Sequence, residues 1–193
     1  MNDIIDVDPT LPVVKNVLLM DNEGKRIAVN YYSSEWATVQ QQAAYEKSLF
    51  AKTSRTNARG EAEIITFDNV VVVYKFVGDL MFFVTGSVDE NEIILHNVLT
   101  GFVEAIVLLL RNAVEKKTVL ENLDLILLAM DEIVEGGLIL ETDGSTIASR
   151  VAMRTVDDGS PLAVDNALNN PNIQTLSQAF GSVRDQLTRS LLR

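Results

Sequence analysis

The hydrophobic pattern near the start of the chain predicts a hairpin followed by a helix. Residues 13–20 (VVKNVLLM) and 25–32 (KRIAVNYY) are rich in strand-forming side chains, and the polar run 21–24 (DNEG) between them favours a tight turn. Residues 38–53 then carry apolar side chains at helical spacing.

Three further strands are predicted at residues 61–67, 70–77 and 80–86, separated by short polar turns. Residues 70–77 are apolar on both faces, and a sheet of that kind must be covered on both sides. We therefore expect an α+β fold with one five-stranded sheet, the helix 38–53 on one face and the later helices on the other.

The next helix, predicted over residues 90–112, carries more apolar surface than one sheet face requires. Its inner stripe consists of Leu95, Leu99, Phe102, Ile106 and Leu109. Ile93, Val107 and Leu108 lie among the polar positions of the other side.

Acidic residues dominate the segment 121–143, which contains seven acids and no Lys, Arg or His. On a helical wheel, one arc holds Glu121, Asp124, Asp131, Glu132 and Glu135, and the opposite arc holds Leu120, Leu123, Ile126, Leu127, Met130, Ile133 and Val134. This pattern favours a solvated helix face over a metal site, because no His, Cys or other partner motif accompanies it.

Leu128 lies alone within that acidic arc. With Ile93, Val107 and Leu108 it forms a candidate protein interface. Ordinary packing within the domain explains the same four residues equally well.

The end of the chain predicts a helix near 144–153, a linker over 154–172 and a last amphipathic helix over 173–193. The last helix has a narrow apolar seam, which we expect to dock on this domain or on a partner: Ile173, Leu176, Phe180, Val183, Leu187 and Leu191. Residues 1–12 form an acidic N-terminal extension, and residues 13–153 form the main domain.

The composition of the chain argues against several classes of partner and location. A net charge of −11 argues against nucleic acid or anionic lipid as the main partner. The absence of cysteine excludes disulfides and favours a cytosolic protein. The acidic start lacks the features of a signal peptide, and the most apolar run, Ala105–Leu110, is too short to span a bilayer.

No catalytic, cofactor-binding or metal-binding residue emerges from the sequence. His96 is the only histidine and has no visible triad or metal partner. Glycines and lysines do not occur at phosphate-loop spacing. We therefore expect no enzyme activity and no cofactor.

Several blocks nevertheless have a recognisable order and spacing. They include KNVLLMDNEGKRIAVNYY, VVYKFVGDLMFFVTGS, ENEIILHNVLTGFVEAIVLLLRNAVEK and LENLDLILLAMDEIVEGGLILETDGSTIASRVAM. Together they resemble the coatomer zeta family of the COPI vesicle coat, which is similar to the sigma small chains of clathrin adaptors.

The resemblance implies a longin-like (SNARE-like) fold and a structural role. It implies direct binding to the large gamma chain of coatomer, membership of a heteroheptamer, and indirect recruitment by an Arf-type GTPase. The expected setting is cytoplasmic, peripheral on Golgi membranes and COPI vesicles, in Golgi-to-endoplasmic-reticulum and intra-Golgi transport, without direct membrane insertion.

Two alternatives remain open at the level of the sequence. In clathrin-adaptor sigma chains, an arginine at the position of Arg26 helps to receive acidic dileucine cargo signals, but the rest of that pocket is not traceable in this chain. A longin-type membrane-fusion regulator would continue into a coiled-coil motif and a membrane anchor, which this sequence does not show.

Overall fold

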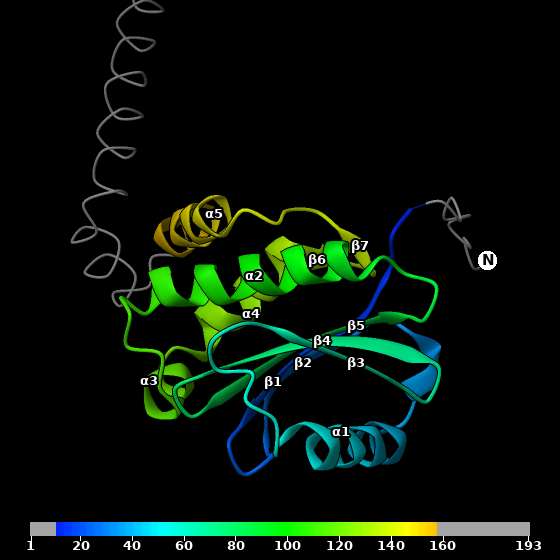
Figure 1. Ribbon diagram of the computed structural model, residues 1–193. Coiled ribbons are helices and arrows are strands. Elements are labelled where there is room, and N and C mark those ends of the chain that lie inside the picture. Colours follow the sequence, from blue (N-terminus) through cyan, green and yellow to red (C-terminus); the bar gives the residue numbers. More distant parts are fainter. Residues whose placement is uncertain (1–10, 158–193) are drawn as a thin grey trace, which may run out of the picture. The chain divides into compact units, whose positions relative to one another are not determined.

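The computed structural model describes residues 11–157 and contains one five-stranded antiparallel sheet (Figure 1). Its strands are β1 (Val14–Asp21), β2 (Arg26–Tyr31), β3 (Glu63–Phe67), β4 (Val70–Val77) and β5 (Leu80–Ser87), in the spatial order β2-β1-β5-β4-β3. The predicted fold class and the predicted strands are confirmed.

Helices cover both faces of the sheet (Figure 1). On one face lies α1 (Val39–Thr53), preceded by a short 3-10 turn at Ser34–Trp36. The other face carries α2 (Glu92–Leu109) and α4 (Leu123–Ile133), and α3 (Lys116–Glu121) lies beside the end of the sheet. A small hairpin of β6 (Val134–Glu135) and β7 (Leu138–Ile139) leads to α5 (Gly144–Asp157), and among the described residues a boundary between two units falls between residues 148 and 149.

Local chemistry explains where α1 begins and how it is fixed to the first hairpin. Thr38 caps α1 by accepting a hydrogen bond from the backbone N–H of Gln41, and the Gln41 side chain accepts one from the backbone of Thr38. Gly24, in the β1–β2 turn, has φ of +78° and lies so close to the Phe50 ring that a Cβ would stand 2.5 Å from it. Only glycine suits both conditions.

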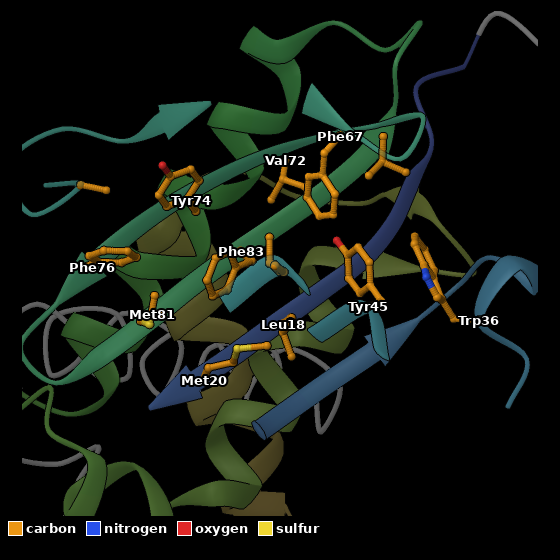
Figure 2. Packing of buried hydrophobic residues seen from close by; sticks show 13 residues of the cluster. Leu18, Met20, Trp36, Tyr45, Phe67, Val72, Tyr74, Phe76, Met81 and Phe83 are labelled. Atoms are coloured by element: carbon orange, nitrogen blue, oxygen red, sulfur yellow. The ribbon is translucent and has the colours of Figure 1, made fainter. Parts of the chain in front are cut away.

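Aromatic residues dominate the core between the sheet and α1 (Figure 2). Tyr45 of α1 packs against Trp36 with ring centroids 4.5 Å apart and stacks on Phe67 of β3 at 5.9 Å. Tyr74 and Phe83 stack on neighbouring strands at 5.8 Å. These contacts fix α1 across the middle of the sheet.

The opposite face is built largely from aliphatic side chains, which α2 contributes from its inner side. Phe102 meets Phe82 of β5 edge to face, with ring centroids 5.3 Å apart. Of the predicted inner stripe, Leu95, Leu99, Phe102 and Ile106 are buried and Leu109 is half-buried. The helical period read from the sequence was therefore correct for α2.

Two sequence-based boundaries differ from the structure. The helix expected around residues 120–135 is two helices, α3 and α4, which meet at Asn122. The last described helix continues to Asp157, so residues 154–157 of the predicted linker are helical.

Candidate functional site

The outer side of α2 carries the apolar residues that the sequence marked as a candidate interface. Asn91 caps the helix, since its side chain accepts a hydrogen bond from the backbone N–H of Ile93 at 2.9 Å. Ile93 is 69% exposed, whereas Val107 and Leu108 are half-buried. Ile93 is thus the most exposed of the candidate interface residues on α2.

A short chain segment, residues 141–144, approaches α2 closely at Gly101 and Glu104; we call it the crossing segment. A Cβ on Gly101 would collide with the carbonyl of Thr142, and a Cβ on Gly144 would collide with Glu104. The crossing segment therefore covers part of α2 at Gly101, which lies between Ile93 and Val107 in the sequence. Sequence reasoning missed this contact; Gly101 in the middle of a helix is the signal that could have found it.

The acidic helix follows its predicted faces in most positions, since Asp124, Asp131 and Glu135 are exposed. Leu125, Ile126, Ala129, Met130 and Ile133 of α4 are buried. Glu132, predicted on the solvated arc, is buried, whereas Leu120 and Leu127, predicted in the core, are exposed.

The helix is broken at Asn122. Asn122 has φ of −127° and ψ of 38°, which is not helical, and its side chain amide donates to the carbonyl of Thr118 at 2.8 Å. Leu120 therefore does not share one helical wheel with α4, whereas Leu127 and Glu132 both lie within the unbroken α4. Leu128, the fourth candidate interface residue, is half-buried on α4.

Arg26 is held by neighbouring side chains at the start of β2. Its guanidinium forms an ion pair with Glu46 of α1 at 2.5 Å and lies over the Tyr31 ring, 5.9 Å from the centroid. The Tyr31 hydroxyl donates to the same carboxylate at 2.8 Å. Burial and this carboxylate raise the pKa of Tyr31 well above its usual value. An acidic ligand at Arg26 would have to compete with Glu46.

A second ion pair anchors α3 to the sheet. The Asp21 side chain is fully buried at the end of β1 and meets the Lys116 ammonium at 2.7 Å. Burial by itself raises the pKa of Asp21, but the hydrogen bond from Lys116 and those from the backbone N–H groups of Lys25 and Glu23 outweigh burial and lower it. This arrangement is structural, because each of its donors belongs to a turn or a helix start.

Chemistry for catalysis or metal binding does not assemble in the part of the chain that the structure describes. Within residues 11–157, no three His, Asp or Glu side chains come together as a metal site. His96 is exposed on α2. The predicted tail seam from Ile173 to Leu191 lies outside the described residues.

α2 has a second property that bears on function. Among the described residues it is the one helix with the length and apolar composition of a membrane span, a property that a core helix of a soluble protein shares. The apolar part of α2 is therefore longer than the run Ala105–Leu110, on which the sequence-based estimate relied. The contact between Phe102 and Phe82 places its inner side in the core.

Comparison with known proteins adds family relationships to this geometry. The family model for the clathrin adaptor complex small chain matches residues 13–158. The chain is 51% identical over 182 residues to coatomer subunit zeta-1 of Arabidopsis thaliana, covering 94% of this chain and 98% of that protein. It is 41% identical over 187 residues to coatomer subunit zeta-1 of Homo sapiens, covering 97% of each.

A solved structure shows the same fold at lower sequence similarity. One chain of a homology model of the full-length AP-3 complex, in a stretched open conformation, superposes with a TM-score of 0.59 and 17% identity. The match covers 76% of this chain and 98% of that chain. At this identity the similarity concerns the fold alone.

Proposed function

The chain belongs to the coatomer zeta subunits of the clathrin adaptor small-chain family, and from this membership we propose that it binds the large gamma chain of the COPI coat. A coatomer subunit is a structural component of a cytoplasmic vesicle coat and associates with other coatomer subunits. The proposal extends this to a heteroheptamer, recruited to Golgi membranes through an Arf-type GTPase, that acts in Golgi-to-endoplasmic-reticulum and intra-Golgi transport.

One structural observation supports a protein partner on the α2 side. Ile93 is 69% exposed, on a helix whose inner side is already packed on the sheet. Val107 and Leu108 lie further along the same helix and are half-buried, and Leu128 lies on α4. A large chain that contacts these residues would remove the exposed apolar area from water.

The relatives and the geometry both disfavour a sigma-type cargo role. The zeta relatives match over nearly the full length, and the guanidinium of Arg26 already pairs with Glu46. We further propose that α2 stays packed on the sheet and does not insert into a bilayer.

Co-expression of the full chain with the gamma chain tests the central proposal. We expect the two chains to elute together in size-exclusion chromatography, and the chain expressed alone to be less soluble or self-associated. Elution of this chain as a soluble monomer that does not bind the gamma chain would contradict the proposal.

Single substitutions then locate the contact. Val107→Asp and Leu128→Asp should weaken gamma binding more than they weaken folding, because a charge buried in an interface without a partner is strongly unfavourable. Unchanged binding in both variants would remove these residues from the interface.

A further inference from the structure

The edge of the sheet formed by β3 carries backbone groups with no partner among residues 11–157. Asp68 and Asn69 form a two-residue turn with φ of 49° and 63°, which makes Phe67 and Val70 a hydrogen-bonded pair. Hydrogen-bonded pairs alternate along antiparallel strands, so Glu63 and Ile65 also bond to β4. The N–H and C=O groups of Ile64 and Thr66 therefore point away from the sheet.

The two edges of the sheet differ in how they are protected. Beside β2, Tyr32 donates from its hydroxyl to the carbonyl of Val134 at 3.1 Å, and Asn30 donates to Asp131 of α4 at 3.0 Å. The β1–β2 register is also shifted between Leu19 and Met20. These features restrict access to β2.

The β3 edge lacks the devices that prevent strand addition. After Glu63 the strand reads IITF, without proline or a charged residue, and its register with β4 is unbroken. The Ile64 side chain is 49% exposed. Native proteins use charges, prolines and bulges to protect such edges, so an unprotected β-branched edge favours pairing with another strand.

We propose that this edge binds β3 of a second copy of the chain, antiparallel and centred on Ile65. In this register, Ile64 of one copy lies opposite Thr66 of the second copy, so their outward N–H and C=O groups satisfy each other. Ile65 meets Ile65 of the second copy on the two-fold axis as a non-hydrogen-bonded pair, and no like charges oppose each other. The two sheets become one continuous sheet.

Charge complementarity favours a second copy as the occupant. The same register brings Phe67 opposite Glu63 of the second copy, and the Lys52 ammonium lies over the Phe67 ring, 5.2 Å from its centroid. Glu63 accepts a hydrogen bond from Tyr74 through one carboxylate oxygen, Oε2. Its other oxygen can receive Lys52 of the second copy, which gives one such pair at each end of the joint.

The affinity of this pairing should be low because the area it buries is small. A pairing of one short strand buries less than the roughly 1,200–2,000 Å² of a stable protein interface, so it forms measurably only at high local concentration. This step rests on the proposed function, since a coat that holds copies of the chain side by side would supply that concentration.

Single cysteines in the full-length chain test the register, since the natural sequence has no cysteine. Under mild oxidation, Ile65→Cys should form a disulfide-linked dimer, because residues in a non-hydrogen-bonded pair have Cα atoms about 4.5 Å apart, within disulfide range. Ile64→Cys and Thr66→Cys serve as matched controls that should each cross-link at least about tenfold less, because each lies opposite a different residue. Mixing these two variants should restore a mixed dimer.

Charge reversal provides an independent test on the Ile65→Cys background. Lys52→Glu and Glu63→Lys should each reduce the dimer yield, and a mixture of the two variants should recover it, because both ends of the mixed joint then carry opposite charges. Recovery distinguishes pairing from a folding defect.

Several results would overturn the proposal. Equal cross-linking at residues 64, 65 and 66 means random collision, and no cross-link at 65 means an unpaired edge. A dimer at 65 that forms only after removal of residues 1–10 means that the chain's own N-terminal segment occupies the edge.

Discussion

The two faces of the sheet are completed in different ways. On the α1 face, aromatic rings fill the core, and the exposed side of the helix carries polar residues, alanines and Val39 at its first turn. On the α2 face, the core is mainly aliphatic, and apolar residues such as Ile93 also point away from it. Each layer has one strongly exposed apolar residue near the start of its helix, Val39 on α1 and Ile93 on α2, and our proposal assigns the partner to the α2 side.

The two faces also differ in the contacts that fix their helices. Beneath α1, the hydroxyls of Tyr45 and Thr85 share a buried hydrogen bond of 2.8 Å. Burial raises the pKa of Tyr45 to about 12, with Thr85 and Asn16 moderating the rise. Such internal hydrogen bonds fix one packing arrangement, while close backbone approach at Gly101 fixes the other face.

The largest expected effect comes from the ring that connects α2 to the sheet. Phe102→Ala should lower the free energy of unfolding by about 3–5 kcal/mol, because it removes a buried ring and leaves a cavity. Leu49→Ala on α1 is the matched variant on the other face and should cost about 2–5 kcal/mol. Urea unfolding measures both, and a cost below 1 kcal/mol for Phe102→Ala would show that α2 is not an integral part of the core.

The close approach between α2 and the crossing segment gives the next effect. Gly101→Ala should cost about 1–3 kcal/mol, because the added methyl meets the Thr142 carbonyl and the backbone must shift. Gly60→Ala is the control, because a Cβ there meets nothing within 4 Å. Equal unfolding midpoints for the two variants would contradict the tight crossing.

The polar pair under α1 should contribute less. Tyr45→Phe should cost about 1 kcal/mol, since it leaves the buried Thr85 hydroxyl without this partner. Adding Thr85→Val should recover part of the loss, because both partners are then apolar and of similar shape. A double-mutant cycle measured by denaturant unfolding tests this, and strictly additive costs would mean that the two hydroxyls do not interact.

Substitutions at the exposed apolar residues of α2 and α1 should have the smallest effect on stability but should differ in their effect on binding. Ile93→Asp and Val39→Asp replace apolar residues that are 69% and 74% exposed in the first turns of α2 and α1. Both should change the free energy of unfolding by no more than about 0.5 kcal/mol, since neither side chain is in the core and an acid suits a helix N-terminus.

Only Ile93→Asp should reduce binding to the gamma chain, as measured by titration of the two purified chains. Equal loss of binding in both variants would assign the partner to both faces, and the contrast between the faces would not hold.

Local patterns predicted most of the fold. The two-residue turn at Asp68–Asn69 and the dense apolar strands around it are strong local signals, and the structure confirms them. The stripe from Leu95 to Ile106 was correct because α2 is unbroken. Most of the acidic helix was also predicted correctly, since Ile126, Met130 and Ile133 are buried and Asp124 and Asp131 are exposed. The exceptions on α4 are Leu127, which is exposed, and Glu132, which is buried.

The candidate site depended more on distant contacts. The sequence identified Ile93, Val107 and Leu108 as apolar residues on a polar helix side, and they do lie on α2. It did not show that residues 141–144 pack against α2 at Gly101, or that Glu46 holds Arg26. Each of these contacts joins segments far apart along the chain.

By itself, the sequence determined the strands, the turns, the helical period of α2 and the excess of apolar residues on its outer side. These follow from side chain periodicity and turn chemistry within a few residues. The tertiary structure alone decided which parts of that surface stay exposed, that Glu132 of α4 is buried while Leu127 is exposed, and that β2 and β3 are the edge strands. Those outcomes depend on which distant backbone and side chains come into contact, and a one-dimensional pattern of polarity does not encode these contacts.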